Sequence, residues 1–131
     1  MTVANTATHI THVGTVAVPV ADQDRALAFY TEVLGFEKRR DMPFGPGQRW
    51  IEVACPRAVT SIALVAGSPE QPVGGDTGIR LISEDVESDH AAFAARGVDV
   101  DQEVLRFGGG VPPMFLLRDP DGNSLVIVGS A

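Results

Sequence analysis

The chain has 131 residues, of which 44% are hydrophobic and 21% are charged, and its formal net charge is −7 at pH 7. This length is typical of one structural unit that can bury a core. The acidic balance argues against a nucleic-acid backbone or an anionic membrane as a partner, and no apolar run is long enough to span a bilayer. The start of the chain does not resemble a signal peptide, so a cytoplasmic protein is expected.

The first half of the sequence predicts one helix among four strands. Residues 12–20 are apolar and β-branched, and they form the first expected strand. Asp22 can cap a helix that begins near Gln23. The apolar positions of this helix are spaced for one face as far as Leu34, and Gly35 ends it as a left-handed cap. The other strands of this half are expected over residues 36–40, 49–54 and 60–65, with a loop of glycines and prolines over 43–47.

The second half repeats this pattern after a linker over residues 67–76, which is rich in Gly and Pro. Its helix is expected over 86–96, with Asp85 as the cap and Ser83 or Glu84 as alternatives. Strands are expected over residues 78–83, 98–104, 114–117 and 125–128. The last two flank Asp119-Pro120-Asp121-Gly122-Asn123, which is the turn chemistry of a β-hairpin.

The two halves have the same order of elements and nearly constant spacing. Asp22 and Asp85 are 63 residues apart, and so are Tyr30 and Phe93, while Gly35 and Gly97 are 62 apart. Recurrence of this kind indicates a tandem duplication. We therefore predict an α+β fold of two βαβββ modules, about 10–66 and 77–129, within one domain over 10–129. Each half is too small to bury its own sheet well, so the halves should pair.

Several motifs together resemble one known family. They are Asp22 with Arg25-Ala26-Leu27-Ala28-Phe29-Tyr30, Leu34-Gly35-Phe36, Asp85-Val86, Arg96-Gly97-Val98 and the turn at 119–123. The family is the vicinal-oxygen-chelate superfamily of glyoxalases, bleomycin-resistance proteins and extradiol dioxygenases. The resemblance covers about residues 10–129 and implies two modules that curl into open half-barrels around a cavity. Metal-dependent members place four ligands there, usually His, Gln or Glu, and the metal polarises substrate oxygens.

The four positions that correspond to these metal ligands do not keep the family's pattern. They fall on Thr15, Ala63, Gly78 and Val126. Val, Ala and Gly side chains have no donor atom, and threonine is a poor single ligand beside imidazole or carboxylate. We therefore expect no metal and no other cofactor.

Few other residues suggest catalysis. His9, His12 and His90 have no spacing that indicates a triad, and we interpret each as a surface or packing residue. The single cysteine, Cys55, excludes an intrachain disulfide, and we interpret it as a structural thiol, since buried thiols are usually inert. The glycines after Phe107 lack the lysine and helix of a phosphate loop, so this segment is expected to form a flexible cavity rim.

Two polar residues are expected to face the cavity. Arg80 is two residues after Gly78 and should share its face. Glu52 should face the cavity with Trp50 if Ile51 and Val53 pack on the helix. Buried charges need partners, and Glu52 and Arg80 could pair with each other. They would then form either an internal ion pair or a base with an oxyanion partner.

The sequence supports two functional hypotheses. The first is a metal-free protein that binds an apolar or aromatic small molecule in the cavity of a homodimer. The second is a divergent lyase, isomerase or dioxygenase-like enzyme of the same superfamily. For the first we name no catalytic residue and expect Arg80 to select a carboxylate, phenolate or carbonyl. The predicted ligand-binding residues are Thr15, Phe44, Trp50, Glu52, Arg80, Phe107 and Met114.

Overall fold

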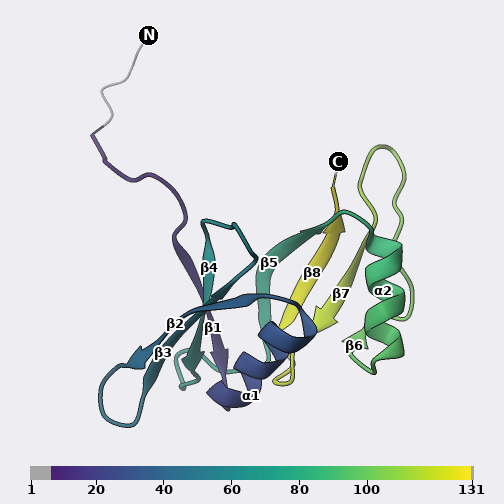
Figure 1. The fold of residues 1–131 in the computed structure, drawn as a ribbon. Coiled ribbons are helices and arrows are strands. Elements are labelled where there is room, and N and C mark those ends of the chain that lie inside the picture. Colours follow the sequence, from purple (N-terminus) through teal and green to yellow (C-terminus); the bar gives the residue numbers. More distant parts are fainter. Residues whose placement is uncertain (1–6, 131) are drawn as a thin grey trace.

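The structure is a computed structural model that describes residues 7–130. Residues 1–6, at which a signal peptide would begin, lie outside the described residues. The fold contains two mixed four-stranded sheets and two main helices (Figure 1). Its elements are β1 (Thr15–Val20), α1 (Gln23–Ala28), the π-helical turn η1 (Phe29–Val33), β2 (Glu37–Pro43), β3 (Arg49–Ala54), β4 (Ser61–Ala66), β5 (Asp76–Ser83), α2 (Val86–Ala95), β6 (Asp99–Val100), β7 (Met114–Arg118) and β8 (Ser124–Gly129).

The sheet topology confirms the predicted α+β fold of two βαβββ modules. The first sheet has the order β1-β4-β3-β2 and the second has the order β5-β8-β7-β6. In each sheet the first strand runs parallel to the last strand of its own module, and the remaining neighbours are antiparallel. The two sheets lie side by side in Figure 1.

Both predicted helix caps are present. The Asp22 side chain accepts a hydrogen bond from the backbone N–H of Arg25 at 3.0 Å, and Asp85 accepts one from Ser88 at 3.0 Å. The first helix differs from the prediction, because its α-helical part ends at Ala28 and the next five residues form η1. Gly35 follows with φ of 79°, a conformation that glycine adopts without strain.

Several strands differ from their predicted bounds, and β2 extends to Pro43 rather than ending at residue 40, so it includes the first residue of the predicted loop. The first strand begins at Thr15 rather than at residue 12. The strand expected over 98–104 is reduced to Asp99–Val100, and only Leu105 pairs again with Met114 in an isolated bridge. In β5 the register against β8 shifts between Asp76 and Arg80, and Gly78 between them has φ of 72°. Such a bulge interrupts regular pairing and bends the strand.

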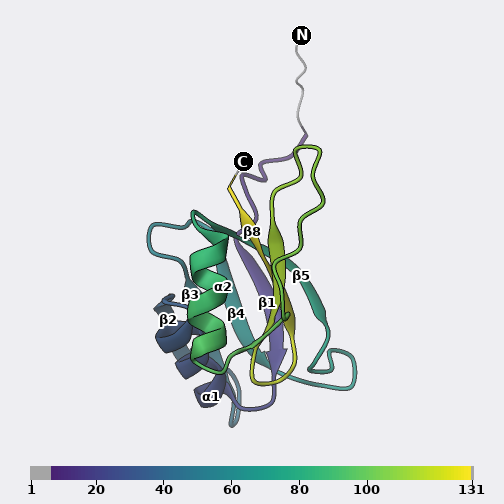
Figure 2. The same cartoon turned by 90° about the vertical axis from the view of Figure 1, so that its right-hand side faces the viewer.

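The core lies between the helices and one face of each sheet. Ile51 and Val53 of the first sheet and Phe115 and Leu117 of the second are fully buried, and so is Tyr30 of η1. The helix α2 covers the second sheet, as the turned view in Figure 2 shows. The helix α1 contacts β3 and β4 of the first sheet. No helix among residues 7–130 is long and apolar enough to cross a membrane.

Side-chain alternation therefore gives each sheet a second face that points away from this core. The open face of the first sheet carries Thr15, Ala17, Trp50, Glu52, Ser61, Ala63 and Val65. The open face of the second sheet carries Arg80, Ile82, Met114, Leu116, Val126 and Val128. Ile82 is 68% exposed, so an apolar side chain on this face is left in contact with water.

Candidate functional site

A hydrogen-bonded chain of side chains crosses the open face of the first sheet. The Thr15 hydroxyl lies 3.0 Å from that of Ser61, because β1 and β4 pair in parallel with these residues opposite each other. The Ser61 hydroxyl donates to Glu52 Oε1 at 2.8 Å. The Trp50 indole Nε1–H donates to Glu52 Oε2 at 2.7 Å. Thr15, Trp50 and Glu52 are thereby brought together.

Glu52 is held as a carboxylate by these donors. Its pKa is lowered, first by the hydrogen bond from Trp50 and then by that from Ser61, against an opposing effect of burial. Arg40 adds a cation with its Nε 3.8 Å from Glu52 Oε2. The pairing of Glu52 with Arg80 that the sequence suggested is wrong, because the carboxylate already has these nearer partners. The alternation argument could not identify Arg40, since the partner depends on how β2 pairs with β3.

An aromatic pocket adjoins this chain of hydrogen bonds. The rings of Phe44 and Trp50 lie 5.8 Å apart between centroids, at an interplanar angle of 60°. They form part of the wall of a pocket of about 290 Å³. The pocket is lined by Ala17, Phe44, Gln48, Arg49, Trp50, Val65, Ala66 and Gln71. The pocket thus adds Phe44 to the group of predicted site residues on the first sheet.

The other predicted site residues belong to the second module. Arg80 is exposed on β5, opposite Val126, and lines a smaller pocket of about 170 Å³ where the two sheets meet. Met114 is half-buried on β7, opposite Val128. Phe107 is 63% exposed in the loop before β7. Within one chain, these three residues do not line the aromatic pocket beside Trp50.

The residues at the family's metal-ligand positions do not fit a metal. Thr15 Oγ1 is engaged with Ser61, Ala63 is a fully buried methyl group, and Gly78 has no side chain. Val126 is half-buried and apolar. Within the described part of the chain, no three His, Cys, Asp or Glu side chains gather in a way that could hold an ion.

Sequence reasoning missed several residues of this region, among them Ser61, Gln48 and Gln71. Ser61 links Thr15 to Glu52, and it could have been found only with the parallel pairing of β1 and β4 in hand. Gln48 and Gln71 come from the β2–β3 turn and from the segment between β4 and β5. Both segments contain Gly and Pro, which indicate loops but not their position over a sheet.

The remaining candidates have other surroundings. His90 packs edge-on against Phe115, with ring centroids 4.9 Å apart, and its Nε2 lies 2.7 Å from the backbone oxygen of Asp101. Cys55 is exposed, so its interpretation as a buried thiol is wrong. Partial desolvation still raises the pKa of its thiol, which disfavours the reactive thiolate.

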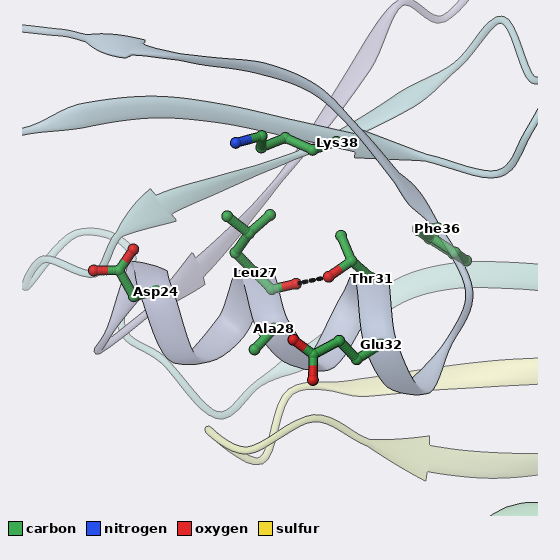
Figure 3. Close-up of a pocket in the computed structure, with 7 residues that line it drawn as sticks. All are labelled: Asp24, Leu27, Ala28, Thr31, Glu32, Phe36 and Lys38. Carbon is green, nitrogen blue, oxygen red and sulfur yellow. Dashed lines mark hydrogen bonds between the residues drawn. The ribbon is translucent and has the colours of Figure 1, made fainter.

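A second hollow lies on the outer side of the first module, between α1 and β2 (Figure 3). It measures about 430 Å³, and Leu27 projects from the helix into it. Two of its three charged lining residues are already engaged, since Asp24 pairs with Arg49 at 2.7 Å and Lys38 lies 3.7 Å from Asp41, whereas Glu32 stands at the rim without an ion pair among the described residues. Thr31 donates to the backbone of its own helix. Asp24, Lys38 and Thr31 are thus used within the fold, and the hollow lacks the aromatic rings found beside the open face. The open face is therefore the better candidate site.

Comparisons with known proteins are consistent with this geometry. The family model for the Glyoxalase/Bleomycin resistance protein/Dioxygenase superfamily matches residues 9–127. The chain is similar to the uncharacterized protein YetH of Bacillus subtilis, with 32% identity over 123 residues that cover 90% of this chain and 98% of the relative.

Two solved structures are similar over almost the whole chain. One is TnmS3, described as an antibiotic binding protein from Streptomyces sp. CB03234, with 36% identity and a TM-score of 0.83. The match covers 95% of this chain and 99% of TnmS3. The other is a superfamily member from Sphaerobacter thermophilus, with 32% identity, a TM-score of 0.86, and coverage of 94% and 100%.

Proposed function

The chain belongs to the glyoxalase/bleomycin resistance protein/dioxygenase superfamily, and from this premise we propose that it is a metal-free binding protein for an apolar or aromatic small molecule. The ligand is held in a cavity between two copies of the chain. The observation that carries the proposal is the exchange of a metal-binding set for an aromatic surface. Donor atoms are lacking at Ala63, Gly78 and Val126, whereas Trp50 and Phe44 form a ring-lined pocket on the same module as Thr15.

The chemistry of the open face suits binding. Small-molecule sites are mostly apolar, with a few fixed polar groups. Here the Glu52 carboxylate holds the indole of Trp50 by its N–H, so the ring is fixed before a ligand arrives. A fixed ring loses little freedom on binding, and aromatic stacking adds about 0.5–1.5 kcal/mol beyond the buried area. The similarity to TnmS3, an antibiotic binding protein, supports the same class of function.

The homodimer follows from the open faces of the two sheets. Each sheet packs one face on the core, and the second sheet exposes Ile82 on the other. In a two-fold dimer, the second sheet of each copy can lie over the first sheet of the other copy. Because a two-fold contact is self-complementary, this arrangement covers the open faces of both copies. This arrangement brings the partner copy's Arg80, Met114 and Phe107 toward Trp50 and completes the set of ligand-binding residues. The ligand is then a small molecule rather than a nucleic acid or a membrane, in line with the net charge of −7.

The alternative is a divergent lyase, isomerase or dioxygenase-like enzyme in which Glu52 acts as a base. A general base works best with a pKa near the operating pH. The pKa of Glu52 is instead lowered, and both of its oxygens accept hydrogen bonds from Trp50 and Ser61. These contacts favour a structural carboxylate over a catalytic one, so the binding function has the better support.

The test combines ligand screening with metal analysis. Protein purified without a tag is dialysed against EDTA, and its melting temperature is measured against a library of aromatic compounds. We expect aromatic compounds to raise the melting temperature of the wild type, Trp50→Ala to abolish the shift, and Trp50→Phe to retain part of it. Elemental analysis before dialysis should give far less than one metal ion per chain. One tightly bound transition metal per chain, or hits that ignore Trp50→Ala, would refute the proposal.

A further inference from the structure

Two glutamine side chains stand at the aromatic pocket with their amides unused. Gln48 lies in the β2–β3 turn and Gln71 in the segment before β5, and both are exposed and line the pocket beside Trp50. Among residues 7–130, neither side-chain amide takes part in a hydrogen bond within the fold. By contrast, Gln23 donates its amide to the backbone oxygens of Arg49 and Leu64, at 2.8 Å each.

The backbones that carry these two amides are fixed. The Phe44 N–H donates to the Gln48 carbonyl at 2.9 Å, which closes the β2–β3 turn. The N–H groups of Ser68 and Gln71 each donate to the other residue's carbonyl at 3.0 Å. Each amide therefore extends from a closed turn. The two turns are separate in the sequence, but both amides line the same pocket.

Among the described residues that line the pocket, Arg49 alone is charged, and it is paired with carboxylates. Arg49 donates to both carboxylate oxygens of Asp41, at 3.0 and 2.7 Å, and to Asp24 at 2.7 Å. The hydrogen bonds that Arg49 donates to Asp41 and then to Asp24 raise the pKa of Arg49 and hold its charge in place. Within one chain, a ligand in the pocket thus meets two neutral amides and an arginine that is already paired.

We propose that the pocket beside Trp50 recognises a flat, neutral aromatic molecule with both a hydrogen-bond donor and an acceptor on its edge. Gln48 and Gln71 are its specificity-determining residues. An amide side chain offers an acceptor oxygen and a donor NH₂, so it pairs with a carboxamide or lactam edge in two places. The pocket of about 290 Å³ lies at the small end of ligand sites, which favours one or two fused rings.

This selectivity has a physical basis in unpaired groups. Gln48 and Gln71 are exposed in the free chain, where water can pair with their amides. A ligand that covers them must replace those bonds, so an analogue that lacks the donor or the acceptor leaves an amide atom unpaired and binds more weakly. A carboxylate must be desolvated at a pocket whose own arginine, Arg49, is already paired. The partner copy's Arg80 can donate to the carbonyl oxygen of a carboxamide as well, so it does not demand a charged ligand. The inference rests on the proposed function and narrows its ligand to neutral amide-like aromatics.

The experiment uses three probes of nearly equal shape. They are 2-naphthamide, with a donor and an acceptor, 2-acetonaphthone, with an acceptor only, and 2-naphthoate, which is charged. Each is titrated into ¹⁵N-labelled full-length protein, and the Trp50 indole and Gln side-chain NH₂ resonances are followed. The sequence contains one tryptophan, so the indole signal is unambiguous. The variants are Gln48→Leu and Gln71→Leu, with Gln102→Leu as the matched control in the second module.

We expect the naphthamide to bind the wild type about tenfold more tightly than either analogue, and to shift the NH₂ signals of Gln48 and Gln71. Each of the two variants should weaken naphthamide binding about three- to tenfold, the effect of one hydrogen bond. Acetonaphthone binding should stay within about twofold, and Gln102→Leu should resemble the wild type. The backbone spectrum of each variant shows that it is folded.

Two outcomes separate this inference from the proposed function. If all three probes bind in a Trp50-dependent way with equal affinity, or if both glutamine variants leave naphthamide binding unchanged, the inference is overturned and the binding function stands. If no probe moves the Trp50 resonance at saturating concentration, the binding function fails and the inference falls with it.

Discussion

The Tyr30 hydroxyl donates a hydrogen bond of 2.9 Å to Asp119 Oδ2, and this bond joins residues 89 positions apart in the chain. Tyr30 belongs to η1 in the first module, and Asp119 begins the hairpin turn of the second. Both side chains are buried. Asn123 of the same turn donates to the Pro19 carbonyl at 2.8 Å and accepts from the Gly74 N–H at 2.8 Å. The turn therefore ties the two modules and the segment between them together.

Removal of the Tyr30 hydroxyl should destabilise the whole chain. Tyr30→Phe keeps the ring in the core but takes one donor from the buried Asp119 carboxylate. We expect a loss of about 1–3 kcal/mol in the free energy of unfolding, measured by urea denaturation at pH 7. Phe29→Leu, on a half-buried neighbour, controls for general loosening of η1. A Tyr30→Phe protein as stable as the wild type would show that the bond adds nothing across the modules.

The same bond predicts a loss of stability at alkaline pH. Burial, followed by the nearby Asp119, raises the pKa of Tyr30 far above its ordinary value. In the unfolded chain the hydroxyl ionises near pH 10, while in the folded chain it stays protonated. A raised folded-state pKa gives stability that is complete below about pH 10 and is lost as the pH rises above it.

The measurement compares the wild type with Tyr30→Phe between pH 7 and 11. The stability difference between them should stay constant up to about pH 10 and then shrink by up to about 1.4 kcal/mol per pH unit. A difference that stays flat to pH 11 would contradict the raised pKa of Tyr30.

Glu52 is expected to act on ligand binding through Trp50. Glu52→Ala removes the acceptor of the indole N–H, so the ring gains freedom that binding must then restrict. We expect aromatic ligands to bind about three- to tenfold more weakly and the anisotropy of Trp50 fluorescence to fall in the free protein. Glu37→Ala, an exposed carboxylate on β2 that pairs with Arg39, is the matched control. Unchanged anisotropy in Glu52→Ala would rule out this positioning role.

The pH dependence of Trp50 has a defined sign. Since the pKa of Glu52 is lowered in the folded chain, its contribution is complete above about pH 4.3 and is lost as the pH falls through the folded value. Trp50 fluorescence should therefore be constant at neutral pH and change only in strong acid. A titration centred near pH 7 would point to another group.

The open face of the second sheet should mediate dimerisation. Ile82→Glu places a charge on an exposed apolar position without opening the core, so it should separate the copies and leave the fold intact. Light scattering is expected to give twice 13.8 kDa for the wild type and 13.8 kDa for the variant at micromolar concentration. Val59→Glu, at an exposed apolar position outside both open faces, should remain dimeric. If the Ile82→Glu variant is still a dimer, the dimer contact does not lie on the open face of the second sheet.

The fold could be predicted further than the site. The cap residues Asp22 and Asp85 are local signals, and both form the expected hydrogen bonds. The π-helical turn could not be predicted, because the apolar spacing up to Leu34 is compatible with an uninterrupted α-helix. The length of β6 is set by how many of its residues pair with β7, and the spacing of valines in the sequence does not predict this pairing.

The candidate site was harder to predict than the fold, because its residues meet through contacts between strands. Alternation along β3 correctly separates Ile51 and Val53, which are buried, from Trp50 and Glu52. It does not show that Ser61 stands opposite Thr15, or that Arg40 is near Glu52, because both facts come from sheet pairing. Gln48 and Gln71 reach the pocket from loops, whose course over the sheet is set by tertiary packing.

Gly78 bears on how this chain could be engineered. A substituted side chain would find open space there, but φ of 72° is a conformation that L-residues adopt only at a cost of about 1–2 kcal/mol. Across the bulge, Asp76 pairs with Ser124 and Arg80 pairs with Val126, so β5 advances by four residues while β8 advances by two. Grafting histidines and carboxylates onto the four ligand positions would thus leave one of them on a distorted backbone. A metalloenzyme designed from this scaffold would first need β5 shortened and straightened, a change of chain length that point substitutions cannot deliver.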